Sequence, residues 1–151
     1  MKKKNEQNKG RRAFIRNSSL AAAGFFIVPR HVLGGKGFIA PSDKLNLAGI
    51  GVGGKGASDI GNAWNNGSEN VVALCDIDWN YAKGPAAKFP DAKKYNDYRK
   101  MFDEMKDSID AVTISTPDHM HAPIAMAAIQ LGKHVYVQKP LTHDIYEARK
   151  L

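Results

Sequence analysis

The chain has 151 residues, of which 43% are hydrophobic and 25% are charged, and its formal net charge at pH 7 is +7. This length and composition fit one globular domain with a hydrophobic core. Residues 1–44 hold ten of the 22 Lys and Arg residues and two of the 15 Asp and Glu residues, so this segment carries a net charge of +8 and the remainder −1. Since the basic residues do not cluster in the segment expected to fold, the sequence argues against nucleic acid as a partner. No run approaches the roughly 20 apolar residues that a membrane-spanning helix needs.

The N-terminal segment, residues 1–29, has the layout of an export signal, with a basic part followed by an apolar run at residues 20–28. Residues 11–16 (Arg-Arg-Ala-Phe-Ile-Arg) resemble the twin-arginine export motif, although Gly10 stands where Ser or Thr is usual. The resemblance implies the twin-arginine export machinery as a partner and a periplasmic or exported location, with signal cleavage and membrane anchoring both left open. A disordered basic tail or a surface amphipathic arm is the alternative. The glycine-rich residues 30–43 predict a linker.

From residue 44 to residue 151, apolar runs alternate with segments of helical periodicity, which predicts a parallel sheet with helices on both faces. The expected strands are residues 45–50, 71–75, a short one around Tyr95, 110–115 and 134–137. The expected helices are residues 54–65, 80–89 (disturbed in its middle by Gly84-Pro85), 98–105, 121–131 and a last one that starts at Asp144 as N-cap. The pattern is that of a Rossmann-type doubly wound α/β domain. It is expected to be incomplete, with the sixth strand and a C-terminal α/β domain missing.

The most specific pattern is Gly51-x-Gly53-x-x-Gly56 between the first strand and the first helix, with Asp76 twenty residues after Gly56 at the tip of the second strand. Gly51 permits the tight turn, Gly53 lets a pyrophosphate approach the backbone, and Gly56 lets the helix pack against the sheet. Gly54 belongs to the same turn.

Asp76 is expected to accept hydrogen bonds from the adenosine ribose hydroxyls of the cofactor. This carboxylate would repel a 2′-phosphate, and the three residues after it (Ile77, Asp78, Trp79) include no Arg or Lys. The pattern therefore predicts NAD rather than NADP. The alternative is a glycine-rich turn in another kind of α/β protein, with Asp76 merely ending a strand.

Two further motifs follow the fourth and fifth strands: residues 116–123 (Thr-Pro-Asp-His-Met-His-Ala-Pro) and residues 138–142 (Gln-Lys-Pro-Leu-Thr). Both are expected at the carboxyl edge of the sheet, where ligands bind in open α/β folds. With the glycine turn before them, these motifs make residues 44–151 resemble the Gfo/Idh/MocA oxidoreductases, a family that includes glucose–fructose oxidoreductase and inositol 2-dehydrogenase. The leader and the second motif resemble the exported bacterial branch of that family.

The resemblance implies that Thr116, Pro117 and His121 contact the nicotinamide and its ribose. It also implies that Lys139 is the catalytic residue, which hydrogen-bonds the substrate hydroxyl or carbonyl and stabilises negative charge during hydride transfer. The family motif usually reads Glu-Lys-Pro, so Gln138 departs from it. Its amide is still expected to hydrogen-bond ribose hydroxyls of the cofactor.

The function implied is NAD-dependent hydride transfer to or from a hydroxyl of a sugar, cyclitol or glycoside. The other acid–base groups would come from a C-terminal domain, so the fragment alone is expected to bind NAD weakly at best and to be inactive. Members of the family often dimerise through that domain, so the full-length protein is expected to form a homo-oligomer. An exported glycosidase that uses bound NAD for transient oxidation and a non-catalytic NAD-binding module are the alternatives. Lys139 favours the dehydrogenase, because such glycosidases typically lack a lysine there. His119 and His121 have no third ligand at a suitable spacing, so no metal site is expected.

Overall fold

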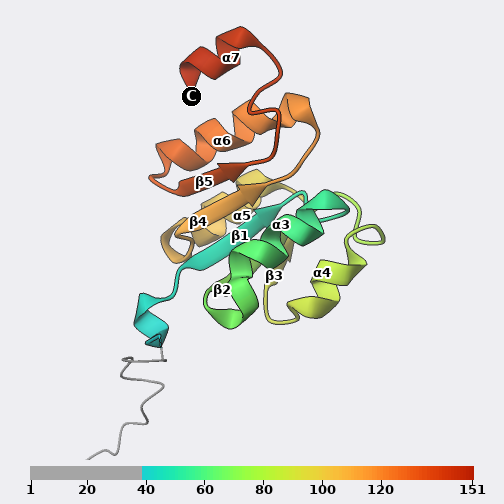
Figure 1. Ribbon diagram of the computed structural model, residues 1–151, viewed down its shortest axis with the longest axis vertical. Coiled ribbons are helices and arrows are strands. Elements are labelled where there is room, and N and C mark those ends of the chain that lie inside the picture. Colours follow the sequence, from blue (N-terminus) through green and yellow to red (C-terminus); the bar gives the residue numbers. More distant parts are fainter. Residues whose placement is uncertain (1–38) are drawn as a thin grey trace, which may run out of the picture. The chain divides into compact units, whose positions relative to one another are not determined.

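The computed structural model describes residues 39–151. The signal-like segment 1–29 and most of the predicted linker 30–43 lie outside the described residues. The described part contains a five-stranded sheet in the order β3-β2-β1-β4-β5 (Figure 1). All neighbouring strands are parallel, and β1 lies at the centre between β2 and β4. This topology confirms the predicted Rossmann-type α/β fold.

The elements agree closely with the sequence pattern. The strands are β1 (Asn46–Ile50), β2 (Asn70–Cys75), β3 (Lys93–Tyr95), β4 (Ala111–Ile114) and β5 (His134–Val137). The α-helices are α3 (Lys55–Trp64), α4 (Lys83–Lys88), α5 (Tyr98–Met105), α6 (His121–Gln130) and α7 (Ile145–Lys150). Short 3-10 helices are η1 (Pro41–Asp43), η2 (Asn65–Gly67), η3 (Lys106–Ser108) and η4 (Asp118–Met120). Most bounds lie within a residue or two of the prediction.

Helix α4 is the main departure, because it starts at Lys83 and not at residue 80. The predicted helix 80–89 had Gly84-Pro85 in its middle. In the structure Pro85 lies in the first turn, where a backbone N–H has no partner within the helix and its absence costs nothing. The proline therefore marks the start of this helix.

Helices cover both faces of the sheet (Figure 1). Helices α5 and α6 bury one hydrophobic cluster that includes Met101, and α3 and α4 bury a second that includes Ile60. Consecutive residues of β1, Leu47 and Ala48, belong to opposite clusters because side chains alternate along a strand. A sheet buried on both faces requires the continuous apolar strands that the sequence shows.

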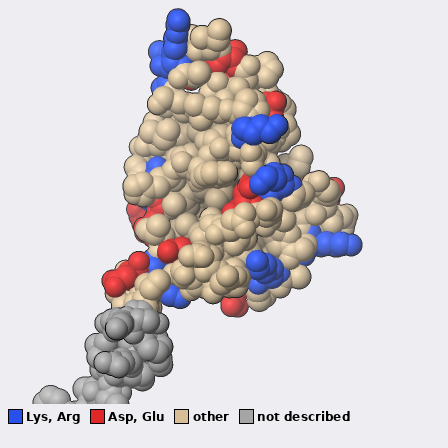
Figure 2. All heavy atoms as spheres, viewed as in Figure 1, with Lys and Arg blue, Asp and Glu red and all other residues tan. Residues whose placement is uncertain are grey.

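The surface of the described part carries mixed charge. On the face that Figure 2 shows, Lys and Arg side chains are scattered among Asp and Glu side chains and form no large patch of one sign. This face therefore offers no electrostatic footprint for nucleic acid. Among the described residues, none of the helices combines the length and the apolar character needed to cross a membrane.

Candidate functional site

A cleft of about 680 Å³ lies where β1, β2 and β4 end. This volume is in the range of small-molecule and cofactor sites. Five of the predicted cofactor contacts line it together: Gly51, Gly53, Asp76, Thr116 and Pro117. The remaining predicted site residues do not line this cleft: Gly54, Gly56, His121, Gln138 and Lys139. The fold thus brings the glycine turn, the tip of β2 and the loop after β4 to one place.

The glycine turn after β1 is closely packed. Gly51 has φ of +73°, and its N–H donates a 2.8 Å hydrogen bond to the carbonyl oxygen of Cys75. A Cβ on Gly51 would lie 2.9 Å from the backbone carbonyl of Ser115. A Cβ on Gly56 would overlap the carbonyl oxygen of Gly51. Both positions therefore require glycine, one for the tight turn and one for the approach of α3 to the sheet.

Asp76 joins this turn to the loop after β2. The residue is 9% exposed, and its Oδ2 accepts a 2.9 Å hydrogen bond from the N–H of Gly53. The other oxygen, Oδ1, accepts one of 2.9 Å from the N–H of Asp78. Each carboxylate oxygen has a second lone pair, so Asp76 keeps acceptor capacity toward the cleft.

Cys75, the last residue of β2, also lines the cleft. Burial, together with the nearby carboxylates of Asp76 and Asp97, raises the pKa of its thiol to about 12. The residue is a buried free thiol, and the protonated form is unreactive at neutral pH.

The loop after β4 presents an unpaired hydroxyl. Thr116 Oγ1 is buried and has no hydrogen-bond partner within the described part of the protein. A buried hydroxyl without a partner costs stability, which a ligand with a polar group can recover. Together with the Asp76 oxygens and the glycine turn, Thr116 forms a polar set suited to a dinucleotide.

Tyr81 lies directly over the glycine turn. A Cβ built on Gly53 or Gly54 would overlap its ring, although the residue as a whole is 67% exposed. The ring therefore occupies the space against these two glycines. Sequence reasoning missed Tyr81. The signal available in the sequence was an aromatic residue five positions after Asp76, in the loop that follows β2.

The loop after β3 and the start of α5 supply another wall that sequence reasoning missed. Asn96, Asp97, Tyr98 and Arg99 line the cleft, and the side-chain amide of Asn96 donates a 3.0 Å hydrogen bond to the carbonyl oxygen of Asp76. The Arg99 guanidinium stacks over the Tyr98 ring with 4.6 Å to its centroid. Their position at the carboxyl end of a strand was the signal. Arg99 also brings a cation to the cleft, whereas the prediction of NAD over NADP considered only the three residues after Asp76.

His121 requires a correction. The sequence predicts it as a cofactor contact, but it is 1% exposed, and both ring nitrogens face backbone carbonyls. Nδ1 lies 2.7 Å from the oxygen of Pro140, and Nε2 lies 2.8 Å from that of Thr116. The imidazole therefore joins the loop after β4 to the loop after β5, and it is closed off from a ligand.

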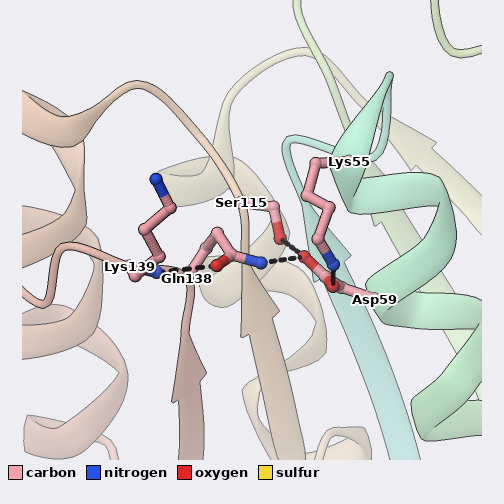
Figure 3. A network of polar contacts seen from close by, with 5 residues as sticks. All are labelled: Lys55, Asp59, Ser115, Gln138 and Lys139. Carbon is pink, nitrogen blue, oxygen red and sulfur yellow. Dashed lines mark hydrogen bonds and ion pairs between the residues drawn. The ribbon is translucent and has the colours of Figure 1, made fainter.

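Gln138 also uses its side chain within the protein. Its Nε2 donates a 2.9 Å hydrogen bond to Asp59 Oδ2, and its Oε1 accepts one of 2.8 Å from the backbone N–H of Lys139 (Figure 3). Both ends of the amide expected to meet the ribose are thus engaged internally. The side chain of Lys139 points away from Asp59 (Figure 3).

Asp59, which sequence reasoning also missed, is a buried acid on α3. Its carboxylate pairs with Lys55 and accepts hydrogen bonds from Gln138 and Ser115. Desolvation by burial raises the pKa of Asp59, but these partners outweigh it and hold the pKa below its usual value. The signal was an acid next to Ile60 on the apolar side of a helix.

Comparison with known proteins identifies the family. The family model described as an oxidoreductase family with an NAD-binding Rossmann fold matches residues 45–151. A glycosyl hydrolase family 109 protein of Shewanella pealeana is 27% identical over 91% of this chain and 35% of its own length. Inositol 2-dehydrogenase of Salmonella typhimurium is 39% identical over 47% of this chain and 21% of its own length.

Among solved structures, myo-inositol 2-dehydrogenase from Lactobacillus plantarum superposes with a TM-score of 0.63 at 28% identity, over 71% of this chain and 31% of that one. The chain spans about a third or less of the length of these relatives. Within residues 39–151, no group of three or more His, Cys, Asp or Glu side chains is arranged to hold a metal ion. The family model covers more than half of the chain, and the glycine turn and Asp76 meet in one cleft. The chain therefore belongs to the Gfo/Idh/MocA oxidoreductase family, of which it carries the NAD-binding Rossmann fold.

Proposed function

We propose that this chain supplies the cofactor-binding part of an NAD-dependent oxidoreductase acting on a hydroxyl of a sugar or cyclitol. The observation that carries the proposal is the hydrogen bond between Asp76 and the N–H of Gly53, which fixes a carboxylate beside the glycine turn at the mouth of the cleft. A carboxylate in this place is the group that distinguishes ribose hydroxyls from a 2′-phosphate. The inositol dehydrogenases among the relatives support a polyhydroxylated substrate.

The residues present fit NAD, which when bound supplies the hydride acceptor for alcohol oxidation. Asp76 would hold the adenosine ribose, and Thr116 Oγ1 offers an unpaired hydroxyl to a polar group of the cofactor. The glycine turn and the first turn of α3 would face the phosphates with backbone N–H groups. Lys139 would donate a hydrogen bond to the substrate oxygen and stabilise the negative charge that develops there.

A calorimetric titration of the 151-residue chain with NAD and with NADP tests the cofactor part of this proposal. We expect NAD to bind more tightly than NADP. Equal affinity for the two, or no binding of either, would overturn it.

The second candidate is a glycosidase that oxidises its substrate only transiently. The similarity to a glycosyl hydrolase family 109 protein over 91% of the chain favours it, and Lys139 favours the dehydrogenase. In a protein that also carries a substrate domain, a dehydrogenase accumulates NADH during turnover, which its absorbance reports. A glycosidase releases sugar from a glycoside without net NADH.

We also propose that the protein is exported to the periplasm or out of the cell. Its support is the Arg11-Arg12 pair in a basic segment, followed by the apolar run at residues 20–28. A reporter protein fused behind residues 1–43 should be exported by cells with an intact twin-arginine system. Changing both arginines to lysine should abolish export, and unchanged export would refute this part.

A further inference from the structure

Asp59 connects three segments that surround the proposed NAD site. It lies on α3 and is 6% exposed, and Oδ2 accepts hydrogen bonds of 2.8 Å from Ser115 Oγ and 2.9 Å from Gln138 Nε2 (Figure 3). Its other oxygen pairs with Lys55, which is the first residue of α3. One buried carboxylate thus contacts the glycine-turn helix, the end of β4 and the end of β5.

The chemistry of the pair fixes the orientation of the Gln138 amide. An ionised carboxylate only accepts hydrogen bonds, so the NH₂ end of the amide must face Asp59. The carbonyl end then faces the other way, where Oε1 accepts the 2.8 Å hydrogen bond from the N–H of Lys139. Reversing the amide would bring two acceptors together at Asp59 and two donors together at Lys139.

The same contact explains why position 138 departs from the Glu-Lys-Pro motif. A glutamate there would place a second carboxylate at hydrogen-bond distance from the buried carboxylate of Asp59. Like charges at hydrogen-bond distance disfavour the ionised pair strongly. With glutamine at position 138, the negative charge lies on Asp59, and the Gln138 side chain connects it to the backbone N–H of Lys139.

We propose that Asp59 is the positioning residue of the active site, acting through Gln138 to hold the backbone of Lys139 in place. The inference rests on the proposed function, in which Lys139 contacts the substrate. The carboxylate that the family motif usually carries next to the lysine is here supplied from α3. Ser115 shares the same carboxylate oxygen, so the loop that carries Thr116 is held by the same group.

A charge exchange between the two positions tests the proposal on the 151-residue chain. The variants are Gln138→Glu, Asp59→Asn and the double variant Asp59→Asn/Gln138→Glu, in which the amide and the carboxylate trade places. The backbone order parameter of the Lys139 amide from NMR relaxation reports its positioning. The dissociation constant for NAD and the midpoint of thermal unfolding are measured beside it.

We expect Gln138→Glu to lower the order parameter of Lys139 from about 0.85 to below about 0.6, while that of Ala73 in β2 stays near about 0.85. We expect it to weaken NAD binding by at most about tenfold, because the lost hydrogen bond lies within the protein and acts on the cofactor only through the loop that carries Thr116. The double variant should recover the order parameter and bring NAD binding within about threefold of the wild type, since an amide at position 59 can donate to a carboxylate at position 138.

Matched controls carry the same chemical changes at exposed sites. Gln130→Glu at the end of α6 and Asp103→Asn on α5 should leave the Lys139 order parameter unchanged. The proposal fails when Gln138→Glu leaves Lys139 as rigid as in the wild type. If Gln138→Glu does not fold, the double variant provides the test. Recovery of folding and of the Lys139 order parameter in the double variant would support the contact between positions 59 and 138, and failure to recover them would overturn the proposal. If the wild-type chain does not bind NAD, the proposed function fails, while the order parameters still decide whether Asp59 positions Lys139.

Discussion

His121 and Pro140 are 19 residues apart in the chain, and a 2.7 Å contact joins the imidazole Nδ1 to the carbonyl oxygen of the proline. Because Nε2 faces the carbonyl oxygen of Thr116, the same ring connects the loop after β4 with the loop after β5. The two loops therefore form one unit at the edge of the sheet.

Replacing His121 by alanine should destabilise the fold. The change removes a fully buried ring, leaves a cavity and removes the contacts of the imidazole with the carbonyl oxygens of Pro140 and Thr116, which together cost about 2–4 kcal/mol. Denaturant unfolding measures this loss of free energy. His134→Ala on the exposed side of β5 is the matched control, with an expected change within about 0.5 kcal/mol. Equal effects of the two changes would contradict a connecting role for His121.

Alanine at Gly56 should destabilise the domain and disturb the turn, because the new Cβ overlaps the carbonyl oxygen of Gly51. The expected loss is about 1–3 kcal/mol, the usual cost of overpacking. Gly61→Ala inside α3 is the control, because a Cβ there would come near only the flexible end of the Lys88 side chain, at 3.3 Å. That change should stabilise by about 0.5–1 kcal/mol through helix propensity. Thermal unfolding of both variants checks the opposite signs.

Asp76→Asn should weaken NAD binding and reduce discrimination against NADP. The variant keeps one side-chain oxygen, which can accept from the N–H of Gly53, but its NH₂ group replaces the oxygen that accepts from the N–H of Asp78, so the charge and one hydrogen bond are lost. We expect about a tenfold weaker affinity for NAD, and a smaller ratio between the two cofactors. Calorimetric titration measures both, with the exposed Asp91→Asn as a control that leaves them unchanged. A retained preference for NAD would assign discrimination to another group.

Asp59 should make stability depend on acid pH. Hydrogen bonds from Lys55, Gln138 and Ser115 outweigh desolvation and lower the pKa of Asp59 from its ordinary value of 3.8. A lowered pKa in the folded state stabilises the protein above the pKa of the unfolded chain, and this contribution is lost as the pH falls through the folded value. Between about pH 5 and pH 3, Asp59→Asn should therefore lose less stability than the wild type. Parallel pH curves for the two proteins would show that Asp59 contributes nothing to this slope.

Local patterns in the sequence specify most of this fold. The apolar runs of β1, β2 and β4 hold buried residues, and the edge strand β5 alternates exposed and half-buried residues in an apolar run, so composition identifies all four strands. The glycine turn and Asp76 are also predictable. The turn joins a strand to a helix that pack closely together, which requires glycine at fixed positions, and the acid follows at the end of the next strand.

The contacts that the sequence did not reveal depend on side chains distant along the chain. Asp59 and Gln138 are separated by 79 residues, and no local pattern signals that they meet. The burial of His121 depends on which side of the start of α6 faces the loop after β5, and the spacing of residues in the sequence does not determine this orientation. The wall formed by Asn96 and Arg99 follows the short strand expected around Tyr95, but no motif in these residues distinguishes side chains that line a cleft from others.

The ring of Tyr81 has a thermodynamic consequence for ligand entry. It lies against Gly53 and Gly54, the surface that a pyrophosphate would approach, so the binding-competent form is one in which the ring has turned away. Exposed side chains change rotamer within nanoseconds, so this motion does not limit the association rate. It reduces the apparent affinity by the fraction of molecules whose ring is displaced. An aromatic side chain thus sets how tightly the turn holds its ligand without delaying the encounter.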